Sequence, residues 1–293
     1  MTTATPAAWG RWGADDEAGA LNLATPELAI AALGLVRTGT VMSLAQRHGP
    51  RHPTAPHRPE SARYMMRDAG DYALGARAPG GFRFAEDIVQ FGTHNGTHVD
   101  ALCHAWRGDS LYNGHLASTL RSTTGAQKLG AEKLRPALTR GVLIDLVASN
   151  GGTLLPPRTK IDAADLEEAT RASGVTPRAG DAVLIRTGWW ESASDDDYFD
   201  NEPGLSTGGA LWLAERDVSL IGADNYGVEV QPAPEGEGFP VHLLLMHERG
   251  IPLIENLDLA ALAAAGAAEF LFVFAPIPLE GSTGSPLNPL AVL

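Results

Sequence analysis

The chain has 293 residues, of which 44% are hydrophobic and 19% charged, a balance typical of a globular protein with a substantial core. The formal net charge of −13 argues against a general nucleic-acid binder, and the single cysteine, Cys103, excludes an intrachain disulfide. No apolar run is long enough to span a bilayer, and Met1 to Gly13 lacks the pattern of a signal peptide. We therefore expect a cytoplasmic protein with no membrane partner.

The first part of the chain predicts a helix and then short strands. Thr25 can cap a first turn in which Pro26 takes the first helical position, so we expect a helix that ends near Leu35. The segments expected after it are a strand over 41–45, an irregular loop rich in proline and histidine over 47–59, and a strand at 89–91.

Helices and strands alternate through the rest of the chain. Asp162 is expected to cap a helix over 162–172 whose first turn is acidic. Further helices are expected over 209–215, 243–248 and 259–264, and strands over 142–146, 182–186, 218–223 and 270–274. No repeat, linker or composition break divides this pattern, which therefore predicts a single α/β domain with a mixed sheet over residues 1–293.

The residues able to do chemistry gather in one short segment. Three of the nine histidines and one aspartate fall within eleven residues, as His94, His98, Asp100 and His104. A straight strand would spread them over about 33 Å, and a helix would turn Asp100 about 120° away from His94. We therefore expect a turn at Gly96-Thr97, followed by a short helix that carries Asp100 and His104 on one face.

This set of imidazoles and carboxylate suits Zn, Mn or Fe(II). Two histidines and one aspartate would leave coordination positions open for water and substrate, which is typical of a catalytic site and not of a closed structural site. The alternative is a structural polar cluster. Three histidines and an aspartate around a Gly-Thr turn are harder to explain in that way.

The segment from His94 to His104 resembles the signature His-x-Gly-Thr-His-x-Asp-x-Pro-x-His of the cyclase family of metal-dependent hydrolases, which includes bacterial kynurenine formamidase and isatin hydrolase. It departs from that signature at Leu102, where the family has proline. The resemblance covers nearly the whole chain, with further matches in Trp12 to Asp16, Tyr112 to Gly114, Gly180 to Trp189 and Gly281 to Pro289. It implies the swivelling β/β/α fold of the family and a homodimer or homotetramer.

The resemblance also assigns roles. It implies that His94, His98 and Asp100 bind a divalent ion, Zn or Mn, and that His104 transfers protons without binding the metal. It adds a distal pair, His242 and Glu255, which could hold a second ion or orient water and substrate, so that each chain would carry one or two ions. The pair is separated by thirteen residues where twelve is expected in formamidase-type members, so the local backbone is expected to differ. A buried polar pair is the alternative interpretation.

These roles predict a metal-dependent hydrolase that cleaves a carbon–nitrogen bond in a small amide, of the cyclic amide or formamide type. The ion would polarise the carbonyl and lower the pKa of water, and His104 would pass a proton to the leaving nitrogen. Two alternatives stay open. One is lactone hydrolysis, cyclisation or dehydration at the same metal, and the other is a non-catalytic protein that binds a ligand on the same fold.

The remaining motifs are interpreted as structural or peripheral. Gly204 to Gly208 matches the pattern of a serine nucleophile elbow, but an acidic loop precedes it in place of a buried strand. Cys103 is expected to pack as a small residue. We interpret the segment that carries His48, His52 and His57 as a surface loop or lid in preference to an ion site. Another polar group, which could border the pocket, consists of Asp224, Asn225 and Glu229.

Overall fold

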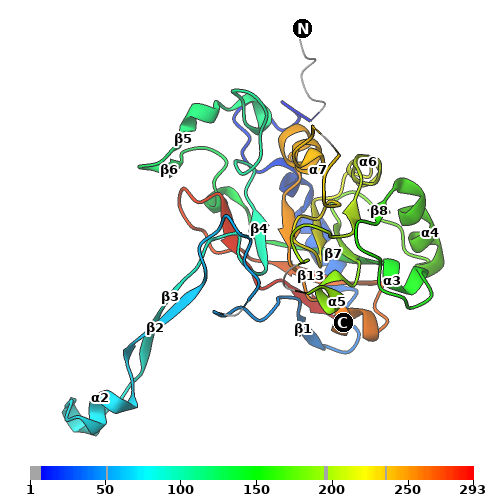
Figure 1. The fold of residues 1–293 in the computed structure, drawn as a ribbon. Helices are drawn as coiled ribbons and strands as arrows, with labels where there is room; N and C mark the ends of the chain where they lie inside the picture. Colours follow the sequence, from blue (N-terminus) through cyan, green and yellow to red (C-terminus); the bar gives the residue numbers. More distant parts are fainter. Residues whose placement is uncertain (1–7, 51, 195–196, 235) are drawn as a thin grey trace.

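The centre of the protein is a nine-stranded mixed sheet, shown in Figure 1. The computed structural model describes residues 8–50, 52–194, 197–234 and 236–293. In their order across the sheet the strands are β1 (Val41–Ser43), β15 (Leu290–Val292), β13 (Glu269–Phe274), β7 (Ala137–Asp145), β9 (Ala182–Arg186), β11 (Leu220–Ala223), β12 (Leu253–Glu255), β4 (His98–Asp100) and β14 (Gly284–Pro286).

The four middle strands, β7, β9, β11 and β12, run parallel to one another. Strands β9 and β11 are runs of valine, leucine, isoleucine, alanine and glycine that are buried along almost their whole length, as expected for parallel strands covered on both faces. The strands on both flanks of this block are antiparallel. Strand β4 therefore lies between two antiparallel neighbours, β12 and β14, which fix its register.

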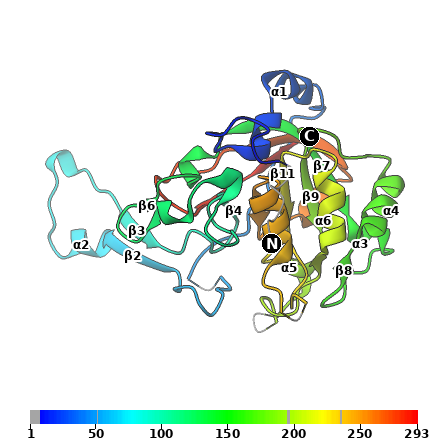
Figure 2. The same cartoon turned by 90° about the horizontal axis from the view of Figure 1, so that it is seen from above.

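Helices cover both faces of the sheet (Figure 2). Helix α1 (Pro26–Leu33) packs against β7 and β13, on the opposite side of the sheet from α3 (Leu146–Ser149), α4 (Ala163–Ser173) and α6 (Thr207–Ala214). The shorter helices are η1 (Gly19–Leu23), η3 (Tyr112–Gly114), η4 (Ala117–Thr119), η5 (Ala131–Lys133), α5 (Trp189–Ser192), α7 (Pro240–His242), the π-helix η6 (Leu243–Glu248) and α8 (Ala260–Ala264). The small strand pairs are β5 (Leu120–Arg121) with β6 (Gly125–Ala126) and β8 (Lys160–Ile161) with β10 (Gly204–Leu205).

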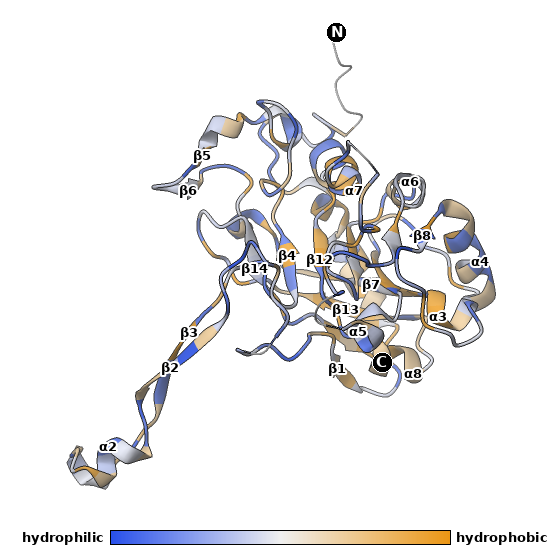
Figure 3. Ribbon diagram, viewed as in Figure 1, coloured by the Kyte–Doolittle hydropathy of each residue, from blue (hydrophilic) through white to orange (hydrophobic). Residues whose placement is uncertain are grey.

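A long hairpin projects from this body. Strands β2 (Ala62–Arg67) and β3 (Glu86–Gln90) pair with each other, and α2 (Ala69–Ala73) and η2 (Pro79–Gly81) lie near its tip. We call residues 62–90 the arm. Figure 1 shows the arm extending away from the rest of the chain, and Figure 3 shows hydrophobic residues along it as well as in the central strands.

The predicted fold class, a single α/β domain with a mixed sheet, is confirmed. Thr25 accepts a hydrogen bond from the backbone of Leu28, and Asp162 begins α4 in a capping box with Asp165, so both predicted helix starts are confirmed. The short helix expected after Asp100 is wrong, because β4 continues through Asp100 and the chain then turns. No helix in the described ranges is long and apolar enough to cross a membrane.

Candidate metal centre

The histidine segment folds back at Gly96, as the sequence predicted. Gly96 has a φ of +68°, and a Cβ atom there would lie 2.5 Å from Nδ1 of His48, so a side chain is excluded by both conformation and space. The hydroxyl of Thr97 accepts a hydrogen bond from the backbone of Gln46 at 2.8 Å and donates one to the carbonyl of Asn256. These two contacts fix the turn against the body and place His98 at the start of β4.

The position of β4 in the sheet selects which side chains meet. His98 and Asp100 are two residues apart on one strand and therefore lie on the same face. The register with β12 sets Glu255 opposite His98. After Asp100 the chain turns, the backbone N–H of His104 donates to Ala101 at 2.8 Å, and the His104 ring stacks on His94 with ring centroids 4.1 Å apart. This turn brings His104 to the cluster where a helix was expected to do so.

Six predicted side chains converge on this face of the sheet. Asp100 lies at the middle, with Oδ1 2.7 Å from Nδ1 of His94 and 3.3 Å from Nε2 of His98. Glu255 bridges two histidines, with 3.2 Å from Oε2 to His98 Nε2 and 3.2 Å from Oε1 to His242 Nε2. Two overlapping groups of donor atoms could each hold a metal ion, and both include Asp100: His94, Asp100 and His104; and His98, Asp100 and Glu255.

The hydrogen bonding of these side chains fits a metal ion. Within the described part of the chain, His94 Nδ1, His98 Nε2 and both carboxylate oxygens of Asp100 are buried and make no hydrogen bond of acceptable geometry, even where they lie close to one another, although buried polar atoms are nearly always paired. The other nitrogen of each ring is held by the protein, His94 Nε2 by the Thr283 hydroxyl at 2.9 Å and His98 Nδ1 by the Gly96 carbonyl at 2.8 Å. One nitrogen fixed and the other aimed at a shared carboxylate is the usual arrangement of metal-binding histidines.

The electrostatics of the cluster favour a positive charge at its centre. Burial would raise the pKa of Glu255, but its contacts with His242 and His98 lower that pKa to about 2. Burial likewise opposes ionisation of Asp100, yet the neighbouring His104 and His94 hold its pKa well below the usual range. Burial would lower the pKa of His98, but the carboxylates of Asp100 and Glu255 close to its Nε2 raise that pKa to about 9. The carboxylates thus keep their charges where a cation can balance them.

His104 differs from the other histidines of the cluster. His104 is half-buried, and the loss of solvent around its ring lowers its pKa to about 4. Its ring is therefore neutral near pH 7. Because it lies against His94, with its centroid 6.4 Å from that of His242, its neutral imidazole can either bind an ion together with His94 and Asp100 or act as a base beside one.

The distal pair, His242 and Glu255, adjoins the centre from α7 and β12. His242 Nδ1 lies 2.5 Å from Oε1 of Glu229, and this oxygen also accepts the backbone N–H of His242 at 3.0 Å. The other carboxylate oxygen of Glu229 accepts the backbone N–H of Val241 at 3.1 Å. Glu229 thus turns Nε2 of His242 towards Glu255 and Asp100. The sequence placed Glu229 near the pocket but gave no signal of this contact.

The backbone between the distal residues explains their spacing. The π-helix η6 follows His242 directly, and the N–H of Arg249 donates to the carbonyl of Leu244, five residues earlier, at 3.1 Å. A π turn holds one more residue than an α turn. The additional residue in this turn can accommodate the thirteen-residue separation of His242 and Glu255.

Several polar residues near the centre have other partners. Asp224 accepts hydrogen bonds from Thr187 and Gly188, and Asn225 donates to the carbonyl of Pro203, so these two residues support loops. The sequence did not single out Glu202, a buried carboxyl that accepts the N–H groups of Tyr226 and Gly227 and whose pKa burial raises well above the usual range. Arg58 was considered only as an arginine that might attract an anionic substrate, and the sequence did not predict its contact with the carbonyl of His94, the support from Thr283 or the Tyr226 ring below the Arg58 guanidinium.

The sites that the sequence analysis discounted are structural. Ser206 caps α6 through the N–H of Gly209, and burial raises the pKa of Cys103 to about 12. His48, His52 and His57 lie in an irregular segment, as predicted, and His57 is exposed, but His48 and His52 pair with Ser61 and Gln46 at 2.8 Å and pack into the body.

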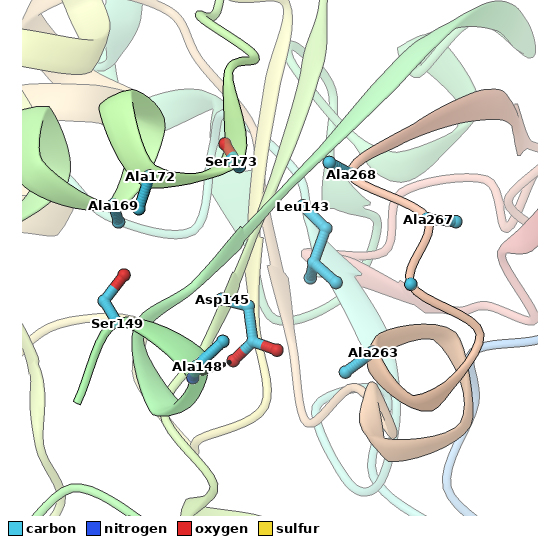
Figure 4. Close-up of a pocket in the computed structure, with 11 residues that line it drawn as sticks. Leu143, Asp145, Ala148, Ser149, Ala169, Ala172, Ser173, Ala263, Ala267 and Ala268 are labelled. Carbon is cyan, nitrogen blue, oxygen red and sulfur yellow. Dashed lines mark hydrogen bonds between the residues drawn. The ribbon is translucent and has the colours of Figure 1, made fainter. Parts of the chain in front are cut away.

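A cavity of about 400 Å³ lies apart from the metal centre, between β7, α3, α4 and α8 (Figure 4). Its lining consists mainly of alanines. Its one carboxylate, Asp145, already binds Arg186 at 3.2 Å and caps α3. It therefore offers no donor set comparable with the centre around Asp100.

Comparison with known proteins shows related chains. The Cyclase family model matches residues 35–230. An isatin hydrolase from Roseibium aggregatum is 28% identical over 220 residues, which cover 72% of this chain and 75% of that protein. A kynurenine formamidase from Bordetella petrii is 30% identical over 174 residues, covering 59% of this chain and 72% of that protein. A crystal structure described as a novel cyclase matches with a TM-score of 0.90 at 35% identity, covering 97% of both chains.

Proposed function

The chain belongs to the Cyclase family, and on this premise we propose that it is a metal-dependent hydrolase that cleaves a small amide of the cyclic amide or formamide type. The observation that carries the proposal is the buried set of unpaired donor atoms around Asp100. The activities named for two relatives, isatin hydrolase and kynurenine formamidase, support an amide as the substrate.

The donor set divides into two parts. We propose that His94, His98 and Asp100 hold a Zn or Mn ion through the atoms that lack hydrogen-bond partners. Glu255 and His242 would hold a second ion shared through Asp100, or orient water and substrate. A divalent ion in such a centre supplies a Lewis acid that polarises a carbonyl and makes water more acidic.

The remaining chemistry belongs to the side chains of the protein. Neutral His104 accepts a proton from the attacking water and delivers it to the leaving nitrogen, which completes the cleavage of the carbon–nitrogen bond. Glu229 keeps His242 oriented. Phe239, which is 40% exposed and lies edge-on to His242 with ring centroids 5.1 Å apart, supplies an apolar wall for a small planar substrate.

The proposal is tested by metal analysis together with a substrate panel. Protein purified without added metal is expected to contain one or two divalent ions per chain. It should hydrolyse cyclic amides or formamides faster than lactones, lose this activity after exhaustive chelation, and regain it with Zn or Mn. Turnover of lactones alone would favour the alternative reaction at the same centre. Absence of both metal and turnover would favour a ligand-binding protein, and full activity without metal would overturn the proposal.

A further inference from the structure

The guanidinium of Arg58 lies beside the metal centre without an ionic partner. Its Nη1 donates a hydrogen bond to the backbone carbonyl of His94, one of the proposed metal ligands. Among the described residues, no carboxylate lies within ion-pair distance of Arg58, and its Nε and Nη2 atoms donate no hydrogen bond. Because the side chain is only half-buried and presents a planar fork of donors, it can bind both oxygens of a carboxylate from outside the chain.

The ring of Tyr226 orients this guanidinium. Cζ of Arg58 lies 5.0 Å from the centroid of the Tyr226 ring, a cation–π contact that fixes the guanidinium and leaves its charge unneutralised. Burial raises the pKa of Tyr226 to about 12, and the nearby charge of Arg58 acts in the opposite direction. The hydroxyl therefore stays protonated near pH 7, and it makes no hydrogen bond with the described residues. It is a second unused donor close to the guanidinium.

Buried groups hold Tyr226 in place. The carboxyl group of Glu202, which is fully buried, accepts the backbone N–H of Tyr226 at 2.6 Å and that of Gly227 at 2.9 Å. The ring of Phe199 lies edge-on to the Tyr226 ring, with ring centroids 4.9 Å apart. Arg58 and Tyr226 are thus fixed by the protein before any ligand binds, and preorganisation of this kind favours binding.

The segment that carries Tyr226 also adjoins the metal centre. A Cβ atom at Gly227, the next residue, would lie 3.3 Å from Cε1 of Phe239 and 4.0 Å from Cε1 of His242. The guanidinium adjoins the same centre through its contact with the carbonyl of His94. A small molecule that binds over the donor set and along the Phe239 ring is therefore within reach of both the guanidinium and the hydroxyl.

The charges around the centre favour a carboxylate as the group bound. The buried carboxylates of Asp100 and Glu255 repel an anionic substrate, and Arg58 supplies a local positive charge that offsets this repulsion. One guanidinium matches the single charge and the two oxygens of a carboxylate. A phosphate group carries more charge and three acceptor oxygens, so it needs more donors than Arg58 and Tyr226 offer.

We propose that Arg58 and Tyr226 form a subsite for a carboxylate, and that the substrate of this enzyme is an amide that also carries a carboxylate. Arg58 binds the two oxygens through two N–H groups, and Tyr226 holds the guanidinium and donates its hydroxyl to one of them. The inference rests on the proposed function, since it places the carboxylate on the molecule whose amide is cleaved at the metal centre. Arg58 thus determines which amides bind and takes no part in bond cleavage.

Matched substrates test the subsite. Formanilide is compared with the formamidobenzoates, which are the same molecule with a carboxylate at the ortho, meta or para position of the ring. The best formamidobenzoate is expected to have a kcat/KM at least about tenfold above that of formanilide. Arg58→Gln should lower this value about 10- to 100-fold, mainly through KM, because it removes hydrogen bonds to a charged group. It should leave the metal content unchanged and the kcat/KM of formanilide within about twofold of wild type.

Two further variants complete the kinetic test. Arg58→Lys keeps the charge without the planar fork and should retain part of the preference for a carboxylate. The control is exposed Arg47→Gln in the same loop, which should change the turnover of neither substrate. An equal loss for both substrates in Arg58→Gln would show that Arg58 only supports the carbonyl of His94, and would overturn the proposal. Equal kcat/KM of formanilide and every formamidobenzoate in the wild type would overturn it as well.

Equilibrium binding separates this inference from the proposed function. Isothermal titration calorimetry of the protein as purified uses benzoate and, as the neutral control, benzamide. The wild type is expected to bind benzoate at least about tenfold more tightly than Arg58→Gln does, with Tyr226→Phe intermediate, and all three should bind benzamide equally. Benzoate bound through Arg58 in a protein that hydrolyses no amide would contradict the proposed function and support the carboxylate subsite. Equal benzoate affinity with and without Arg58, or no benzoate binding, would overturn the subsite.

Discussion

Two buried ionic clusters in this sheet differ in whether the protein supplies partners for their polar atoms. On β7, the guanidinium of Arg140 binds both carboxylate oxygens of Asp181 at 3.1 and 2.6 Å, Glu269 at 2.9 Å and the carbonyl of Thr176 at 2.9 Å. Around Asp100, two carboxylates face four imidazoles, and several buried atoms have no hydrogen-bond partner in the described part of the protein. The protein thus supplies hydrogen-bond partners for the Arg140 cluster, whereas it leaves several buried atoms of the Asp100 cluster without one.

Buried charge alone therefore does not identify a functional centre. Arg140 is a permanent cation with a fixed geometry, so its cluster needs nothing from outside the protein. Asp100 and Glu255 have no lysine or arginine partner in the described ranges and are neutralised only by histidines, which can lose their protons. Because these histidines can lose their protons, the Asp100 cluster can exchange the protons for a metal ion.

Replacing Asp100→Asn should have the largest effect on the incomplete cluster, because this carboxylate belongs to both candidate metal groups. We expect loss of bound metal and a fall in kcat of at least about 10⁴-fold, since metal-ion catalysis contributes several kcal/mol and each 1.36 kcal/mol is a factor of ten. Elemental analysis and steady-state kinetics measure both quantities. The control is Asp87→Asn on the exposed arm, which should change neither. Full metal occupancy in the Asp100→Asn variant would contradict the interpretation of the Asp100 cluster as a metal centre.

Replacing His104→Ala separates proton transfer from metal binding within the same cluster. We expect kcat to fall about 10²- to 10⁴-fold with metal content unchanged, because His104 supplies a neutral base and no essential metal bond. Metal content and kcat are measured on the same preparation. If the variant kept wild-type kcat at equal metal content, the proton-transfer role would be wrong.

Replacing Arg140→Met tests the complete cluster, where stability and not activity should respond. Removal of the cation leaves Asp181 buried without its partner, which costs about 3–5 kcal/mol of unfolding free energy. Denaturant unfolding measures this loss, and kcat with metal content should be unchanged in the folded protein. The matched control is exposed Arg158→Met, expected to stay within about 0.5 kcal/mol of wild type. A loss of metal in the Arg140 variant would show that the two clusters are not independent.

Replacing Glu229→Gln should produce the smallest effect. The amide can still accept a backbone N–H, but it no longer provides a carboxylate for Nδ1 of His242. Loss of such an orienting partner costs about 10- to 100-fold in metal affinity or activity. Metal titration of the chelated protein measures the change, with exposed Glu237→Gln as the control. Unchanged affinity and kcat would indicate that Glu229 only fixes the backbone at α7.

The sequence was informative where the structure depends on local residues. The ten-residue separation of His94 and His104 excluded a straight strand, and Gly96 predicted the position of the turn. The helix expected to carry Asp100 and His104 did not form because hydrogen bonds to β12 and β14, which lie more than 150 residues later in the chain, hold Asp100 in a strand, and the chain turns directly after it. No local pattern reports partners at that distance.

Residues that support the metal centre from distant parts of the chain also could not be predicted. Thr283 holds His94 across 189 residues, and Glu202 lies in a segment with no motif. Strand β2 was missed because its sequence, Ala-Arg-Tyr-Met-Met-Arg, does not alternate as a half-buried strand does. Its large apolar side chains are exposed and not buried in a core, so patterns based on burial in a core do not apply to it.

The wide turn of η6 has a consequence for how this protein is compared with others. Its ends are anchored, by His242 in α7 and by β12 in the sheet, so one residue can be inserted or deleted between them while both side chains keep their places. The number of residues between His242 and Glu255 is therefore a poor criterion for recognising related proteins. An alignment that requires constant spacing between the distal histidine and glutamate would reject proteins that share the complete centre.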